Sequence, residues 1–361
     1  MNHHTIEFGD ILKLRKLFRK RNLTDASHES KTIQIALMGA ILIVIFLFSF
    51  SLGRYGVPVK EVIRIFCNKL IHLRQTWTAE MEIVVINIRL PRIIMACLVG
   101  CALSAAGASY QGVFQNPMAS PDILGASSGA AFGAALAILL HANTQIITLS
   151  AFLSSLITVM AVFFIAERAP GLRVVNLILA GIMVGSLFTA GTSYIKLVAD
   201  PSNQLPAITY WMMGSLSGSK LGQVAFVIVP MALGLIPLLL IRWQINILTL
   251  GDDEARTLGV NTNLLRMIVI LCATLITAAS VSVSGMIGWV GLVIPHLCRK
   301  IVGNNYRYLL PASMISGAIF LLIVDNVSRN LLAVEIPIGI LTAFIGAPFF
   351  IYLIARQEKT I

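Results

Sequence analysis

One stretch of the sequence decides the fold: Ser284-Gly285-Met286-Ile287-Gly288-Trp289-Val290-Gly291-Leu292-Val293-Ile294-Pro295-His296-Leu297-Cys298-Arg299. Most of its side chains are apolar, and its glycines allow helix backbones to touch, as in the packed helices of membrane proteins. The stretch passes through Pro295 and ends at the basic pair Arg299-Lys300, which is typical of a membrane interface. We therefore expect a helix packed inside a bundle of spans, rather than a solitary membrane anchor.

The composition also indicates a lipid environment. Hydrophobic residues make up 57% and charged residues only 12% of the 361 residues, whereas about a quarter of an ordinary soluble domain is charged. Mean hydropathy is +0.86. The formal net charge of +11 would also fit nucleic acid. However, the basic residues gather in the N-terminal tail and in short loops, where the positive-inside tendency explains them. We expect a lipid bilayer as the surroundings and no nucleic-acid partner.

The apolar segments predict an all-α integral membrane protein. Residues 1–31 are expected to form a cytoplasmic tail, followed by a single transmembrane domain over residues 32–361. No cleavable signal is apparent, and an even number of spans puts both termini in the cytoplasm. The loop charges support this orientation only in part, because the expected outer loop 54–88 is basic as well. The ten expected spans are residues 32–53, 91–114, 122–141, 146–166, 174–198, 221–241, 263–284, 287–303, 308–328 and 337–355.

Two neighbouring spans are rich in very small residues. Gly100 and Gly107 lie in the second span, and Gly129 and Gly133 lie in the third. Such residues permit close helix contacts, because no side chain stands between the backbones. The two spans are joined by a segment with two prolines, which we expect to be a tight cytoplasmic hairpin. It reads Gln115-Asn116-Pro117-Met118-Ala119-Ser120-Pro121-Asp122.

Several motifs resemble those of FecCD-type permeases, the membrane subunits of ABC importers for iron-siderophore, haem and cobalamin. The resemblance runs from about Ile88 to Tyr352 and implies a type II importer architecture of about ten transmembrane helices. It begins with Ile88-Arg89-Leu90-Pro91-Arg92 and includes the opening stretch. The further matching blocks are Leu179-Ala180-Gly181, Tyr210-Trp211-Met212-Met213-Gly214, Leu309-Leu310-Pro311, Glu335-Ile336-Pro337-Ile338-Gly339 and Gly346-Ala347-Pro348-Phe349-Phe350.

Three arginines are candidates for contact with a substrate-binding protein. Arg89 and Arg92 are three residues apart beside Pro91, so they project from about the same side of a helix at its outer edge. Anchoring at the membrane interface explains them equally well. The resemblance implies that their guanidiniums, with that of Arg329, receive carboxylates from an extracytoplasmic binding protein.

The resemblance also implies a cytoplasmic gate at the Asn116-Pro117-Met118 turn, although a bare turn of this kind is as often only structural. A second part of the gate is expected at the inner end of the fifth span, at Arg173, Val174 and Val175. Related chains often have small hydroxyl residues there. A gate formed in this chain would therefore be bulkier and more apolar.

The segment of about residues 248–262 predicts a short cytoplasmic helix. Acids at its start match the helix dipole, and a glycine stands at each end. An interfacial helix on the bilayer is the alternative, but successive acids disfavour contact with anionic lipid. The resemblance implies coupling helices that contact a cytoplasmic ATPase. The residues assigned to this role are Gly251, Asp252, Asp253, Glu254, Ala255, Arg256, Leu258 and Gly259.

The chain is expected to perform no chemistry itself. It lacks a Gly-x-x-x-x-Gly-Lys-Ser/Thr motif for nucleotide phosphates. Its five cysteines and His296 form no metal-ligand pattern, so we expect no catalytic residue, cofactor or metal. Asp325 is the only acid within an apolar run, which disfavours an ion-coupled secondary transporter. A secondary transporter or channel nevertheless stays the main alternative, followed by a membrane scaffold without transport.

The mechanism that the resemblance implies is ATP-driven alternating access in the cytoplasmic membrane. Two copies of the chain would form a homodimer around a path lined by the fifth spans, with two copies of an ABC ATPase and one binding protein as partners. Met183, Ser186, Met212 and Met213 lie in plausible lining regions without identifying a substrate. A ferric siderophore is the expected cargo, with haem and cobalamin as the alternatives.

Overall fold

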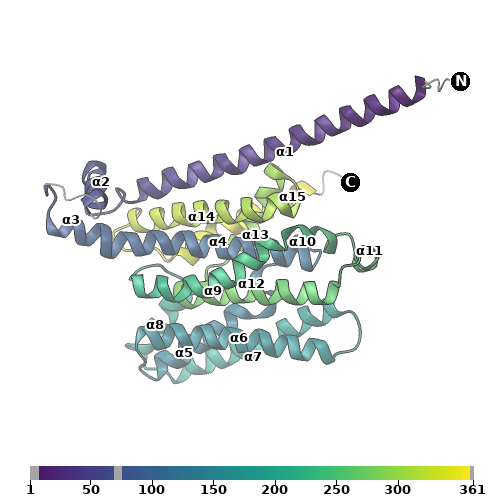
Figure 1. Ribbon diagram of the computed structural model, residues 1–361. Coiled ribbons are helices and arrows are strands. Elements are labelled where there is room, and N and C mark those ends of the chain that lie inside the picture. Colours follow the sequence, from purple (N-terminus) through teal and green to yellow (C-terminus); the bar gives the residue numbers. More distant parts are fainter. Residues whose placement is uncertain (1–7, 69–74, 358–361) are drawn as a thin grey trace, which may run out of the picture.

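Every element that the computed structural model describes is helical (Figure 1). The structure describes the backbone of residues 8–68 and 75–357, and the side chains of residues 29–68, 75–172, 174–251 and 254–352. The elements are α1 (Phe8–Ser49), α2 (Val59–Asn68), α3 (Ala79–Ile83), the π-helix η1 (Val84–Arg89), α4 (Leu90–Val113), the 3₁₀-helix η2 (Pro121–Leu124), α5 (Ala126–Leu139), α6 (Thr144–Arg168), α7 (Arg173–Val198), α8 (Gln204–Met212), α9 (Leu221–Leu240), α10 (Arg242–Leu248), α11 (Asp252–Thr257), α12 (Thr262–Ser284), α13 (Val290–Val302), α14 (Tyr306–Asn330) and α15 (Ile338–Gln357).

Each expected span corresponds to a helix of the bundle: α1, α4, α5, α6, α7, α9, α12, α13, α14 and α15. Seven described helices are long and apolar enough to cross a membrane, and shorter apolar helices supplement them. The predicted all-α membrane class is therefore confirmed. Two helices begin well before the residues predicted for them. The helix containing α4 begins at Ala79, inside the expected outer loop, and α1 begins at Phe8, inside the expected tail.

The helix α4 lies at the centre of the bundle and packs against α12, α13 and α14. A Cβ atom on Gly100 would collide with the carbonyl of Gly317 in α14, and one on Gly107 would collide with that of Gly291 in α13. The backbones therefore touch at both places, because neither glycine has a side chain. Gly129 and Gly133 allow the same approach of α5 to α6. The predicted close contacts in both spans are confirmed.

Two expected spans begin later than predicted. The stretch from Ser284 to Arg299 is not one helix: α12 ends at Ser284, and α13 begins at Val290. Gly285 and Trp289 between them have φ angles of 66° and 71°, which a right-handed helix excludes. The third expected span, 122–141, is likewise helical only from Ala126, after the left-handed Gly125 (φ 74°). The predicted end of a span at Ser284 is therefore confirmed, whereas the predicted starts at 287 and 122 were too early. Non-helical backbone is tolerated at membrane depth where it is packed in protein or lines a cavity.

The bundle has two ends with different elements (Figure 1). We call the end that carries α2, α3 and α8 the α8 end, and the opposite end, which carries α10 and α11, the α11 end. The first residues of α1 and the last of α15 both lie toward the α11 end (Figure 1). This agrees with an even number of crossings.

The contact between α4 and α13 predicts a large effect of one methyl group. Gly107→Ala should destabilise the protein by about 1–3 kcal/mol, because the added Cβ meets a backbone carbonyl that cannot move independently. Thermal unfolding in detergent measures the effect. Gly39→Ala in α1 is the control, because its Cβ meets no atom within 4 Å. Equal unfolding temperatures for the two variants would show that the contact is looser than described.

Candidate functional site

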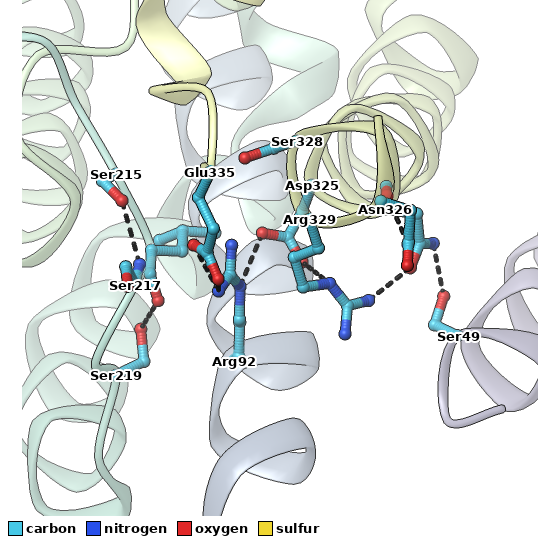
Figure 2. Close-up of polar contacts among 12 residues, drawn as sticks. Ser49, Arg92, Ser215, Ser217, Ser219, Asp325, Asn326, Ser328, Arg329 and Glu335 are labelled. Atoms are coloured by element: carbon cyan, nitrogen blue, oxygen red, sulfur yellow. Dashed lines mark hydrogen bonds and ion pairs between the residues drawn. The ribbon is translucent and has the colours of Figure 1, made fainter. Parts of the chain in front are cut away.

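A cluster of buried charges joins α4 to α14 at the α8 end (Figure 2). Arg92 Nε in α4 lies 2.8 Å from Asp325 Oδ1 in α14, and Arg92 Nη1 lies 2.9 Å from Glu335 Oε2 in the connection that precedes α15. Arg329, one turn after Asp325, places its Nε 3.2 Å from the other oxygen of that carboxylate. Asp325 is completely buried. Two arginines thus compensate one buried carboxylate, and the half-exposed Glu335 compensates the second positive charge.

Hydrogen bonds connect this cluster to the end of α1. Arg89 donates to the carbonyl oxygens of Phe50 and Tyr55, each at 2.5 Å. Arg329 also donates to the side-chain oxygen of Asn326, whose amide donates to Ser49 Oγ at 2.7 Å (Figure 2). The cluster therefore fixes α1, α4, α14 and the chain before α15 relative to one another.

The three arginines predicted to dock a binding protein lie together, but not on the surface. Arg89, Arg92 and Arg329 are only 3%, 5% and 7% exposed, so the expectation of free guanidiniums at the outer edge was wrong. Buried charges need partners, and these arginines find theirs within the chain. Asp325 was noted from the sequence but its pairing was not, and Glu335 was missed as a partner. A carboxylate inside an apolar span was the available signal, because such a group requires a cation nearby.

The expected gate turn, Asn116-Pro117-Met118, is exposed and lies at the α11 end. Asn116 Oδ1 accepts a hydrogen bond from the backbone N–H of Met118 at 2.9 Å, and the Met118 side chain is 47% exposed. In the second expected part of the gate, Val174 is half-buried against the core and Val175 is 45% exposed. The Arg173 side chain lies outside the described residues. The gate role stays a prediction.

The short helix expected near residues 248–262 is present as α11. It follows Gly251, which has a φ of 123°. It ends in a Schellman motif, in which Gly259 N–H donates to Arg256 O at 2.9 Å and Val260 N–H donates to Ala255 O at 3.2 Å. The predicted helix with a glycine at each end is therefore confirmed. Ala255 is buried, whereas Glu254, Arg256, Leu258 and Gly259 are exposed; the side chains of Asp252 and Asp253 lie outside the described residues.

The helix α10, which was not predicted from the sequence, attaches this segment to the bundle. Asn246 accepts from Tyr306 N–H at 2.8 Å and donates to Asn305 Oδ1 at 3.2 Å. Gln115, beside the gate turn, donates to the carbonyl of Leu248, the last residue of α10, at 2.6 Å. These contacts join positions far apart in the chain, so no local sequence signal could have identified them.

A groove of about 530 Å³ opens on the surface between α5 and α7. Its polar lining includes a carboxylate and a row of hydroxyls, and glycines on both helices bring the backbones together. The lining residues are Asp122, Ile123, Gly125, Ser128, Gly181, Ile182, Gly185, Ser186, Thr189, Ala190 and Ser193.

A bundle of apolar helices, with polar clusters at both ends and a polar groove along one face, defines a multi-pass membrane transport subunit. The chain belongs to the FecCD transport family, whose model matches residues 41–356.

Two relatives and one solved structure cover most of the chain. The molybdate import system permease protein MolB of Haemophilus influenzae is 38% identical, over 88% of this chain and 94% of that protein. A protein of Helicobacter pylori named as an iron chelatin transport system permease is 38% identical, over 91% and 99%. The structure is an inward-facing metal-chelate type ABC transporter, with a TM-score of 0.81 and 37% identity over 90% of this chain and 99% of that one. The chain is therefore an ABC importer permease subunit and not the catalytic subunit.

Loss of the central carboxylate should destabilise the α8 end. Asp325→Asn leaves two buried guanidiniums with less compensation, and removal of one partner from a buried ion pair typically costs about 3–5 kcal/mol. Glu335→Gln is the comparison, expected to cost about 1 kcal/mol or less because its side chain is 30% exposed. Unfolding in detergent followed by circular dichroism measures both. Equal losses for the two variants would mean that Asp325 is not the centre of the cluster.

Proposed function

We propose that this chain forms a homodimeric permease in the cytoplasmic membrane, which imports a metal chelate by ATP-driven alternating access. A ferric siderophore is the proposed cargo, with haem and cobalamin as the alternatives. The observation that carries the proposal is the hydrogen bond between Gln115 and Leu248, because it connects the segment proposed to contact an ATPase with the turn proposed as a gate.

The α11 end is proposed to face the cytoplasm. Basic residues lie on the connections and helix ends there, as the positive-inside tendency favours, although the connection 54–88 at the α8 end is basic as well. They include Arg168, Arg173, Arg242, Arg256, Arg299, Lys300 and Arg307. Both termini would then be cytoplasmic, and the α8 end would face outward.

The α10–α11 segment is proposed to receive the motion of two cytoplasmic ATPase subunits. Glu254 is exposed, and Leu250 and Leu258 are each 60% exposed. Together they offer an apolar surface with a charged rim, a combination that suits a protein partner better than water. Gly251, Asp252, Asp253, Ala255, Arg256 and Gly259 complete this proposed contact segment.

The motion is proposed to reach the gate through Gln115. This residue lies at the end of α4 with a φ of 50°, directly before the Asn116-Pro117-Met118 turn. Its hydrogen bond to Leu248 O makes the turn follow α10 when α10 shifts. Arg173, Val174 and Val175 at the start of α7 are the proposed second wall of the gate.

An extracytoplasmic binding protein is proposed to dock at the α8 end. Because Arg89, Arg92 and Arg329 are engaged within the chain, their proposed role there is to hold the docking surface in shape. Glu335 is the charged member of the cluster that is within reach of a partner, with a side chain 30% exposed. Uptake driven by an ion gradient without ATP would favour the alternative of a secondary transporter.

The proposed ATPase contact can be broken without changing a span. Glu254→Lys reverses an exposed charge, and Gly259→Pro is incompatible with the φ of 77° at that position. The double variant should lose co-purification with the ATPase subunit and ATP-dependent uptake in proteoliposomes, while its size-exclusion profile stays that of the wild type. A variant that keeps its ATPase and transports normally would put the contact elsewhere.

The proposed link to the gate makes a separate prediction. Gln115→Ala should retain ATPase binding and ATP hydrolysis but lower uptake about fivefold, because a hydrogen bond of this kind contributes about 1 kcal/mol. Gln244→Ala on α10 is the matched control, expected to transport like the wild type. Uptake and hydrolysis are measured together in the same proteoliposomes. If both fall in parallel, Gln115 supports assembly rather than transmission.

A further inference from the structure

We infer that the groove between α5 and α7 selects cationic and hydrogen-bond-donating chelates over anions, and that Asp122 is the residue that sets this preference. The inference rests on the proposed function, because it takes the groove as part of the transport path between two copies. It names the chemical class of cargo that the path admits.

The groove lies near the middle of the bundle's length. Gly125, three residues after Asp122, packs against Gly185, since a Cβ on Gly125 would lie 3.2 Å from Gly185 Cα. Gly185 is close to the midpoint of α7, which runs for 26 residues from Arg173 to Val198. A Cβ on Gly181 would collide with the carbonyl of Ile123, next to Asp122. The carboxylate is thus held within the length of α7, nearer its first residue than its last.

An exposed carboxylate at this depth cannot face lipid without a penalty. Asp122 is exposed in the single chain, and an aspartate at the centre of a spanning helix costs about 2.5–3.5 kcal/mol on insertion scales. A neighbouring copy that encloses a water-filled path along this face removes the penalty. The position of Asp122 therefore favours a path over a lipid-facing surface.

Three of the four hydroxyls that line the groove, all but that of Ser128, are arranged as acceptors. Ser186, Thr189 and Ser193 donate their hydroxyl protons to the carbonyls of Ile182, Gly185 and Thr189, at 2.7, 2.8 and 3.0 Å. Each hydroxyl oxygen then presents lone pairs rather than a proton to the groove. One oxygen of Asp122 accepts a hydrogen bond from Ser127, and a carboxylate has further acceptor capacity.

Charge and hydrogen bonding therefore favour the same class of ligand. Among the described residues that line the groove, Asp122 is the only ionisable one. Ammonium groups, amide N–H groups and metal-bound water can donate to these oxygens, whereas an oxyanion would meet like charge and only the Ser128 hydroxyl as a possible donor. Two copies around one path would double the negative charge. The MolB relative is named for molybdate, and this groove points to a cargo of different charge.

Two octahedral metal complexes of similar size and opposite charge can test the preference directly. Hexaamminecobalt(III) carries three positive charges and many N–H donors, and hexacyanoferrate(III) carries three negative charges. Binding of each to the complete transporter, in nanodiscs of zwitterionic lipid, is measured by equilibrium dialysis and metal analysis. The wild type should bind the cobalt complex more tightly than the iron complex.

Variants assign the preference to one carboxylate. Asp122→Asn, which keeps the shape, should weaken cobalt-complex binding about tenfold, and Asp122→Lys should reverse the preference, because each changes the charge in contact with the ligand. Asp200→Asn is the control, since Asp200 is an exposed carboxylate outside the groove. It should bind like the wild type. Size-exclusion profiles and ATP hydrolysis identify any variant that misfolds.

Equal wild-type binding of the two complexes would overturn the inference. So would an unchanged preference in a folded Asp122→Asn variant, which would leave Asp122 as a structural cap of the η2 turn. The proposed function fails differently, by absence of ATP-driven uptake in the wild type. Binding of the complexes needs no ATP, so the two failures are distinguishable.

Discussion

The backbone contact of α4 with α13 and α14 is the constraint on which the rest of the structure depends. Gly100 and Gly107 remove the side chains that would separate these helices. Close approach at Gly100 allows Arg92, two turns earlier, to reach Asp325 in α14. Close approach at Gly107 brings Gly291 to Pro121, whose Cγ would lie 2.6 Å from a Cβ on Gly291. The close packing of α4 therefore positions both the charge cluster and the start of the groove.

The sequence predicted those features that depend on local or periodic signals. Apolar runs located the ten spans, and Gly251 and Gly259 located the limits of α11, because a glycine can adopt the backbone conformation that ends a helix. Small residues also predicted which spans approach closely. The end of α12 at Ser284 was predicted, but the non-helical residues 121–125 and 287–289 at the start of two expected spans were missed, because an apolar run does not reveal irregular backbone that is packed in protein.

The candidate sites were predicted less completely than the fold. Arg89, Arg92 and Arg329 were correctly grouped, but their burial depends on Asp325, on Glu335 and on the carbonyls of Phe50 and Tyr55, which come from distant parts of the chain. Gln115 carries no motif of its own, and its partner is a backbone carbonyl more than a hundred residues away. Contacts of this kind follow from tertiary packing.

The break after α12 limits where residues can be inserted into the chain. Where α12 stops, Ser284 O accepts from Ser215 N–H at 2.8 Å, and Gly214 O accepts from Ile338 N–H at 2.8 Å. Three connections, before α9, before α13 and before α15, therefore share one set of backbone hydrogen bonds. An extra residue in any one of them would shift its register against the other two and leave a buried amide without an acceptor. Loops normally tolerate insertions, but none of these three connections can gain a residue without breaking a hydrogen bond to another.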